Sequence, residues 1–294
     1  MTTDSITAPK SSPPPQPAEE VPTILIQPTR GLASLQLRAL WQYRELLYFL
    51  VWRDVKVRYK QTALGIIWVL LQPLLSTVVF TVLFGVLLGV QTGTVPYPVF
   101  ALAGLVPWQY FSGSLNRGST NLVNSANLIT KVYFPRLIIP LSSVLSGLVD
   151  FAVGFGAMIV LMLVYRVPLT WNVLLLPFFL LLAIATALGF SLWLSALNVK
   201  YRDIKYVVPF LVQIWMYVTP VVYPVTIIPE PLRPYLALNP MTGVVEGFRW
   251  ALLGEAGAHA PGLLFAVSVA LSLVVLITGA FYFRSVERTF ADII

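Results

Sequence analysis

The sequence predicts an all-α integral membrane protein. Of its 294 residues, 57% are hydrophobic and 11% are charged, and the mean hydropathy is +0.81, whereas about a quarter of the residues in a soluble domain are charged. The charges are clustered, so that uncharged stretches cover residues 61–116, 167–199, 206–229 and 256–283. Since a helix of about 20 apolar residues crosses a bilayer, these stretches predict membrane spans and exclude a single soluble core.

Six spans result when the uncharged stretches are divided at their polar, proline and glycine residues. They cover about residues 63–90, 97–115, 137–165, 172–197, 206–223 and 261–283. An even number places both termini on one side of the membrane, and 16 of the 19 lysine and arginine residues then fall on that side. Because cytoplasmic loops retain positive charge, both termini are predicted to be cytoplasmic. Topology accounts for the net charge of +7, and no nucleic-acid partner is expected.

Three regions follow one another along the chain. Residues 1–30 are rich in serine and proline and are predicted to form a disordered cytoplasmic tail. Residues 31–62 contain an amphipathic helix that lies in the membrane surface, with its cations on the polar face. Its apolar positions recur at helical spacing and are Leu37, Leu40, Trp41, Leu47, Tyr48, Val51, Trp52 and Val55. Residues 63–294 form the six-span domain.

Two predicted parts do not span the membrane. Residues 118–129 begin with Ser, Thr and Asn suited to N-capping, and their few cations favour a protein partner over lipid headgroups.

Six prolines lie between residues 218 and 260 and exclude a lipid-exposed crossing there. Two short helices at about 229–237 and 241–253, dipping into the outer half of the membrane, fit this region, and Glu246 can pair with Arg249 three residues later. A decorated outer loop is the alternative.

Residues that carry catalytic chemistry are scarce. The sequence has no cysteine, and His259 is its single histidine, which excludes a thiol nucleophile or a disulfide framework and argues against a metal centre. Asp150 is the one charge well inside a predicted span, and an intramembrane carboxylate is a functional candidate by default. The alternative is a protonated or hydrogen-bonded carboxyl at a helix contact. This structural interpretation is favoured because no basic partner for Asp150 is predicted within the spans.

Four motifs occur together in the chain. They are Trp52 to Leu74 (WRDVKVRYKQTALGIIWVLLQPL), Tyr201-Arg202-Asp203-Ile204, Thr219-Pro220-Val221-Val222-Tyr223-Pro224, and Leu238-Asn239-Pro240-Met241 followed by Glu246-Gly247-Phe248-Arg249. In this order they resemble the membrane subunits of type-2 ABC exporters, and in particular the branch that exports polysaccharides and polyol phosphates such as O-antigen, capsule or teichoic acid. The resemblance covers about residues 35–290.

The resemblance implies a homodimer around a central conduit in the bacterial inner membrane. Two copies of a separate subunit would bind ATP with Mg²⁺ and hydrolyse it, in agreement with the absence of a G-x-x-x-x-G-K-[ST] loop from this sequence. The chain itself would be a transport subunit without a cofactor and would not be an enzyme. Its cargo would be a lipid-linked glycan, which enters from the cytoplasmic side among membrane lipids.

The resemblance also assigns roles to individual residues. The coupling helix that docks on the ATPase would use Ser119, Asn121, Leu122, Asn124, Ser125, Asn127, Leu128 and Lys131. Uncharged polar and aromatic side chains would line the conduit, namely Tyr110, Trp193, Gln213, Trp215, Tyr217 and Tyr223. Arg58, Lys60, Arg202 and Lys205 would lie at the cytoplasmic mouth, where they attract a lipid pyrophosphate or serve topology alone. Asn239, Glu246 and Arg249 would belong to an outer gate formed by re-entrant helices.

Two other functions fit parts of the sequence. A type-2 ABC permease for a small drug or lipid would share the architecture and differ in cargo. A membrane-embedded glycosyltransferase or acyltransferase would need acidic or histidine residues clustered at one membrane face, and the sequence offers no such cluster. The predicted function is therefore export of a lipid-linked polysaccharide.

Overall fold

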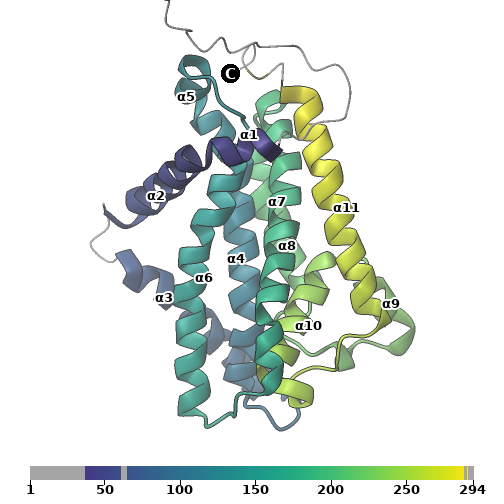
Figure 1. The fold of residues 1–294 in the computed structure, drawn as a ribbon. Coiled ribbons are helices and arrows are strands. Elements are labelled where there is room, and N and C mark those ends of the chain that lie inside the picture. The colour runs from purple at the N-terminus through teal and green to yellow at the C-terminus, as the bar shows by residue number, and fades with distance from the viewer. Residues whose placement is uncertain (1–36, 61–64, 288–289, 291–294) are drawn as a thin grey trace, which may run out of the picture. The chain divides into compact units, whose positions relative to one another are not determined.

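The computed structural model describes residues 37–60, 65–287 and 290, and the regular elements in these ranges are all helical (Figure 1). The longer elements are α1 (Leu37–Gln42), α2 (Arg44–Lys60), α3 (Gly65–Phe80), the π-helical η1 (Thr81–Leu87), α4 (Tyr97–Asn124), α5 (Ala126–Lys131), α6 (Ile138–Val164), α7 (Leu176–Lys200), α8 (Ile204–Val218), α9 (Arg233–Leu236), α10 (Pro240–Leu253) and α11 (Leu263–Val286). Short 3-10 turns are η2 (Trp171–Leu175), η3 (Val225–Ile227), η4 (Glu230–Leu232) and η5 (Gly254–Ala256). The predicted tail, residues 1–30, lies outside the described residues.

Within the described residues, helices cover most of each predicted span, although α8 ends at Val218, five residues before the predicted end of the fifth span. Four helical stretches are long and apolar enough to cross a membrane, namely Ile67–Leu87, Ile138–Val164, Trp171–Lys200 and Leu263–Val286. The second predicted span lies on α4 and the fifth on α8, which has 15 residues. The structure thus confirms an all-helical chain over the described residues, with four helices that qualify as spans by length and hydropathy.

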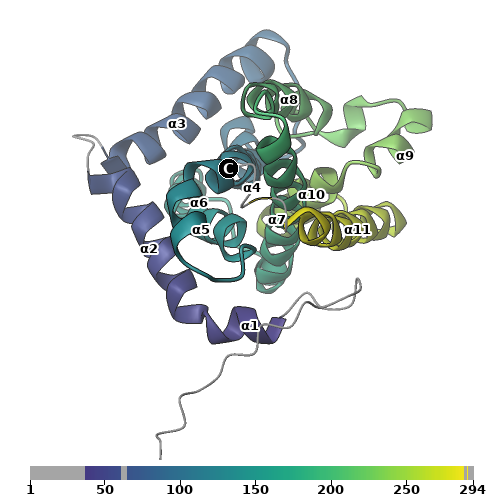
Figure 2. The same cartoon turned by 90° about the horizontal axis from the view of Figure 1, so that it is seen from above.

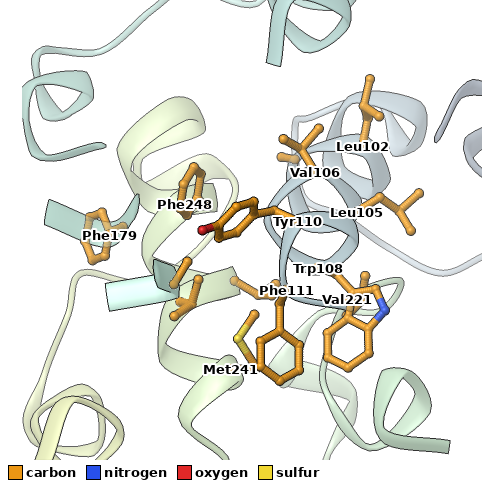
Figure 3. Close-up of a cluster of buried hydrophobic side chains, with 14 of the residues drawn as sticks. Leu102, Leu105, Val106, Trp108, Tyr110, Phe111, Phe179, Val221, Met241 and Phe248 are labelled. Atoms are coloured by element: carbon orange, nitrogen blue, oxygen red, sulfur yellow. The ribbon is translucent and has the colours of Figure 1, made fainter. Parts of the chain in front are cut away.

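Helix α4 is the centre of the bundle. It contacts α3, α6, α7, α8 and α10, and Figure 2 shows it near the middle when the bundle is viewed end on. Most of its side chains from Val99 to Phe111 are buried. Figure 3 shows these side chains packed against Phe179 of α7 and Met241 and Phe248 of α10. This apolar core fixes the positions of the charged groups described below.

Helices α7 and α11 cross closely because each carries a glycine at the contact. A Cβ atom on Gly189 would lie 2.7 Å from the backbone nitrogen of Leu276, and one on Gly279 would overlap the carbonyl oxygen of Gly189. Small residues allow such close approach of membrane helices, and hydroxyl groups add hydrogen bonds between them. One of these joins Thr186 Oγ1 to Ser272 Oγ at 2.9 Å.

Helix α2 has two apolar faces, whereas the sequence pattern predicts one. Leu47 and Leu50 pack against the bundle, and Leu50 is 5% exposed. Tyr48 and Trp52 of α2 are 64% and 52% exposed, and Trp41 of the preceding α1 is 72% exposed. The predicted apolar positions therefore divide into those that pack on protein and those that are exposed, because three-and-four spacing identifies apolar positions without separating the two.

The predicted helix at 118–129 does not begin as a separate element. Helix α4 continues through 118–124, and a bend at Ser125 separates it from α5. The hydroxyl of Ser119 donates to a carbonyl three residues earlier, so it caps no helix N-terminus. A Cβ atom on Gly118 would overlap a side chain of α7, and this close packing accounts for the straight continuation of α4.

The proline-rich region forms short helices near the predicted positions. The segment predicted at 229–237 corresponds to η4 and α9, and the one at 241–253 corresponds to α10. Helix α10 packs on α4, α7 and α11, and Met241 and Phe248 are 0% exposed. The side chain of Asn239 accepts a hydrogen bond from the backbone N–H of Met241 and caps the helix. Protein therefore buries α10, whereas Pro229, Pro231 and Pro234 of the preceding segment are exposed.

Candidate functional site

Two groups of charged side chains contact α4, one near each of its ends. The Asp150 cluster consists of Asp150, Arg58, Tyr59 and Arg117. The Arg249 cluster consists of Arg249, Glu246 and the backbone carbonyls of Phe100, Pro220 and Val221. They are the candidate sites because charges inside a membrane protein are costly to bury and usually serve function or specific packing.

Asp150, on α6, binds two arginines at once. Its Oδ2 atom pairs with Arg58 of α2 and lies 3.2 Å from Nη1 of Arg117 on α4. Its Oδ1 atom accepts a hydrogen bond from the phenol of Tyr59. The side chains of Asp150 and Arg58 are 22% exposed and that of Arg117 is 32% exposed. Burial, and then the hydrogen bond to Asp150, raise the pKa of Tyr59 to about 12, so the phenol keeps its proton and donates.

Close packing of α4 on α6 brings Arg117 to Asp150. A Cβ atom on Gly147 of α6 would lie 2.7 Å from Nη2 of Arg117 and 2.7 Å from Oγ of Ser114. Only glycine leaves room for the guanidinium at this position. The Arg117–Asp150 contact thus depends on a small residue one turn before the carboxylate.

Serines on α6 extend the polar contact toward α2. Ser142 and Ser146 precede Asp150 at four-residue spacing and therefore share its helix face. Ser142 Oγ donates to Oδ2 of Asp54 at 3.4 Å, and Nη2 of Arg58 donates to Ser146 Oγ at 3.5 Å. The C-terminal half of α2 is thus attached to α6 through polar side chains, while its N-terminal half is attached through leucines.

The basic partners of Asp150 correct the sequence interpretation. Arg117 was assigned to a connection between spans, and Arg58 to the cytoplasmic mouth. The signal that could have placed Arg117 is the absence of proline between Pro107 and the end of α4, which allows an uninterrupted helix to carry Arg117 alongside α6.

Arg249, on α10, is 0% exposed, and all three nitrogen atoms of its guanidinium donate hydrogen bonds. Its Nη1 atom donates to Glu246 at 2.9 Å and to the carbonyl of Pro220 at 2.5 Å. Further hydrogen bonds reach the carbonyls of Val221 and Phe100, and the guanidinium carbon lies 3.7 Å from the centroid of the Phe100 ring. The predicted pairing of Glu246 with Arg249 is confirmed, and this arginine joins α10 to the ends of α4 and α8.

Asn239 connects the same region to α8. Its Oδ1 atom accepts from Nε1 of Trp215 at 2.9 Å, and its Nδ2 atom donates to Oγ1 of Thr219 at 2.8 Å. The Trp215 ring packs edge-on against Phe111 and Phe190, with centroids 5.1 and 4.9 Å apart. Trp215, a predicted conduit residue, therefore packs against the protein core.

The other predicted conduit residues lie in different environments. Tyr110 is 2% exposed, and its hydroxyl donates to a carbonyl of α6. Trp193 stacks on Tyr282 of α11 with ring centroids 4.3 Å apart. Gln213 and Tyr217 are exposed on α8. The half-buried Tyr223 donates to a backbone carbonyl at the end of α8. Gln213 and Tyr217 are the pair from this set that offers a shared exposed face.

The predicted coupling residues divide into exposed and buried groups. Asn124, Asn127 and Lys131 are exposed, and Asn121 and Leu128 are partly exposed. Ser119, Leu122 and Ser125 are buried. Asn121 donates to the carbonyl of Ile139 and to Ser143, while the carbonyl of Ser119 accepts from Asn198 of α7. The buried members therefore join α4 to its neighbouring helices.

The four predicted cationic residues are also divided. Arg58 belongs to the Asp150 cluster, whereas Lys60, Arg202 and Lys205 are exposed. The ammonium of Lys205 lies 4.7 Å from the ring centroid of Tyr206. An aromatic ring beside an exposed cation is typical of a membrane–water interface.

Comparison with known proteins identifies the family. The model of the family described as ABC-2 type transporter matches residues 45–253. The chain belongs to this family. Both charge clusters lie within the matched range, as do all of α2 after Arg44 and the region of α9 and α10. Membership makes the chain a membrane subunit of a transporter and not an enzyme.

Relatives extend the match over most of the chain. The "O-antigen export system permease protein RfbA" of Myxococcus xanthus is 36% identical over 259 residues, which cover 87% of this chain and 98% of that protein. A protein of the same name from Klebsiella pneumoniae is 29% identical and covers 85% and 95%. The "Polysialic acid transport protein KpsM" of Escherichia coli is 24% identical and covers 80% and 91%. The resemblance stated from the motifs is confirmed.

Proposed function

We propose that the chain is the transmembrane subunit of an ATP-driven exporter that moves a lipid-linked polysaccharide of the O-antigen type across the inner membrane. The observation that carries the proposal is the 36% identity to an O-antigen export permease over nearly that protein's whole length. The similarity to a polysialic acid transport protein supports a polysaccharide cargo. In this proposal the chain has six spans and cytoplasmic termini, and a separate subunit binds ATP and Mg²⁺.

The exposed face of α8 supports a homodimer around a conduit. On a helix of 3.6 residues per turn, Tyr206, Phe210, Gln213 and Tyr217 share one stripe, and all four are exposed. An amide such as Gln213 is unfavourable against lipid tails. A second copy, with the glycan between the two copies, would give these uncharged polar and aromatic groups suitable contacts, because weak stacking and hydrogen bonds allow a polymer to slide.

The end of the bundle at α5 supports docking of an ATPase. Asn124, Asn127 and Lys131 are exposed there, and Val132 and Tyr133 are 50% and 73% exposed directly after α5. Exposed apolar and aromatic side chains next to polar ones are typical of a protein interface. Lys60, Arg202 and Lys205 remain available to attract the pyrophosphate of the carrier lipid.

The function is tested by export in cells that lack the chromosomal copy of the gene. The chain and its candidate ATPase are coexpressed and copurified, and glycan at the cell surface is measured by immunoblotting. We expect a complex with two copies of each subunit and restored surface glycan. Copurification without any surface glycan, in cells that synthesise the lipid-linked precursor, would contradict the cargo assignment.

Two alanine variants test the conduit and the docking surface in the same cells. Gln213→Ala with Tyr217→Ala should lower export several-fold while the complex still assembles, and the matched control is Leu211→Ala, which is 51% exposed on the other flank of α8. Tyr133→Ala should weaken copurification of the ATPase, with Tyr235→Ala, 68% exposed on α9, as its control. If a variant and its control have equal effects, the corresponding assignment, to the conduit or to the docking surface, is wrong.

A further inference from the structure

The Asp150 cluster holds more positive than negative charge. Arg58 and Arg117 come from different helices, and both bind the same oxygen, Oδ2 of Asp150. One carboxylate attracts each guanidinium, while the two guanidinium groups repel one another across the shared oxygen. Each arginine therefore weakens the hold of Asp150 on the other.

The two arginines differ in how firmly their helices are fixed. Arg117 belongs to α4, which is joined to α6 also by the hydrogen bonds from Tyr110 to the carbonyl of Val144 and from Asn121 to the carbonyl of Ile139. Arg58 lies near the end of α2, which packs on α6 and α3 at the edge of the bundle (Figure 2). The C-terminal end of α2 is therefore the part that separates when the cluster loosens.

We propose that Asp150 is a positioning residue that fastens the C-terminal end of α2 to α6, and that Arg117 makes this attachment releasable during transport. The next described helix along the chain is α3, which packs on α4 and α6 and whose side chains Trp68 and Leu75 are 57% and 50% exposed. Release of α2 therefore frees the first predicted span to shift against α4 and α6. The transport part of this inference depends on the proposed function, whereas the attachment itself does not.

Disulfide cross-linking measures the attachment directly. The natural sequence has no cysteine, so Asp54→Cys with Ser142→Cys introduces one pair at positions whose side chains are in contact at 3.4 Å. In membranes that hold the full complex, Asp150→Asn should slow oxidation of this pair by roughly threefold to tenfold, since the charge that attracts both guanidinium groups is then lost while their mutual repulsion remains. Arg117→Gln should speed oxidation or leave it at the same rate, because Arg58 then has Asp150 to itself.

The different responses expected of these two variants separate the proposal from general damage. A variant that merely loosens the bundle would slow oxidation at either position. The double variant Asp150→Asn/Arg117→Gln removes the repulsion and should recover at least half of the lost rate. If Asp150→Asn leaves the rate unchanged, or if Arg117→Gln slows oxidation as much as Asp150→Asn does, the proposal is wrong. Arg117→Gln keeps the test valid should Asp150→Asn fail to accumulate.

Export in the oxidised state tests release. Cells that carry the cysteine pair should lose most export, about fivefold or more, on oxidation and regain it on reduction, because the disulfide prevents α2 from leaving α6. Each single-cysteine variant is the control and should export equally under both conditions. Full export by the cross-linked complex would show that α2 stays attached and would overturn the release step. Absence of export by the unsubstituted chain in the same cells would instead contradict the proposed function and leave the cross-linking result standing.

Discussion

The two charge clusters attached to α4 differ in the kind of partner that each charge has. They are separated along the helix by about 25 Å, from Phe100 to Arg117 at about 1.5 Å per residue. Arg249 is 0% exposed, and three of its acceptors are backbone carbonyls. Asp150 is 22% exposed, and its three partners are side chains from two other helices.

This difference determines which end of the bundle can rearrange. A carbonyl at a helix end stays in place as long as the backbone does, so Arg249 joins α10, α4 and the end of α8 permanently. A side chain can exchange partners by rotation about its own bonds, and Asp150 holds two competing ones. We infer that the end at α10 is rigid and that the end at α2 is adjustable.

Replacement of Arg249 should have the largest effect. Arg249→Met removes the guanidinium and leaves the Glu246 carboxyl and the carbonyls of Pro220 and Val221 without their donor, which costs about 3–5 kcal/mol. We expect little folded protein in membranes and a sharply lower thermal midpoint in detergent. The control is Arg233→Met, because Arg233 also donates to backbone carbonyls but its side chain is 33% exposed.

The control measures how much stability is lost when an arginine that donates to backbone carbonyls is removed from a partly exposed position. Arg233→Met should cost no more than about 1 kcal/mol, because water replaces the lost donor. If both variants change the thermal midpoint by similar amounts, burial does not distinguish these arginines and the rigid character of the α10 end is refuted.

Replacement of Gly147 on α6 should have the next largest effect, with Gly156 of the same helix as its control. Gly147→Ala places a methyl group 2.7 Å from Arg117 and from Ser114, so Arg117 must leave Asp150 or the helices must separate, at about 1–3 kcal/mol. Gly156→Ala meets no atom within 4 Å and should be neutral or stabilise the helix by up to about 1 kcal/mol. Thermal unfolding of both variants in detergent tests this, and equal loss of stability would refute the packing argument.

The sequence predicted the α10 end well because its interactions are local. Six prolines restrict the chain between α8 and α11 to short helices, and Asn239-Pro240 marks the start of α10. Glu246 and Arg249 are three residues apart, so helical geometry alone pairs them. The carbonyl partners of Arg249 are distant in sequence, and no local pattern indicates them.

The Asp150 end was harder to predict because its partners come from separate helices. Arg58 and Arg117 lie 92 and 33 positions before Asp150, and a single sequence contains no signal for their contact. The end of α4 was also misplaced, because Ser119 and its neighbours have the composition of a helix start but form hydrogen bonds within the continuing helix. Close packing on α7 at Gly118 favours continuation of α4 over a new helix start. Such packing depends on the tertiary structure, which local sequence does not reveal.

Removal of one phenol from each end should give the smallest effect and the most direct comparison. The Tyr97 hydroxyl donates to the carbonyl of Val222 at 2.5 Å in a buried position, so Tyr97→Phe leaves that carbonyl without a donor and should cost about 1–2 kcal/mol. Tyr59→Phe removes one donor from Asp150, but Arg58 and Arg117 still neutralise the carboxylate. The cost should stay below about 1 kcal/mol, and unfolding in detergent at pH 7 measures both variants.

The pH dependence of the Tyr59→Phe effect adds an internal control. The pKa of Tyr59 is raised from 10.0 to about 12 in the folded chain, first by burial and then by Asp150. A raised pKa means that the stabilisation is fully present below pH 10 and is lost as the pH rises through 12. The difference between wild type and Tyr59→Phe should therefore be the same at pH 7 and pH 9. If the difference already shrinks between pH 7 and pH 9, the phenol ionises at a lower pH than its contact with Asp150 allows. Asp150 would then have to accept this hydrogen bond from another donor.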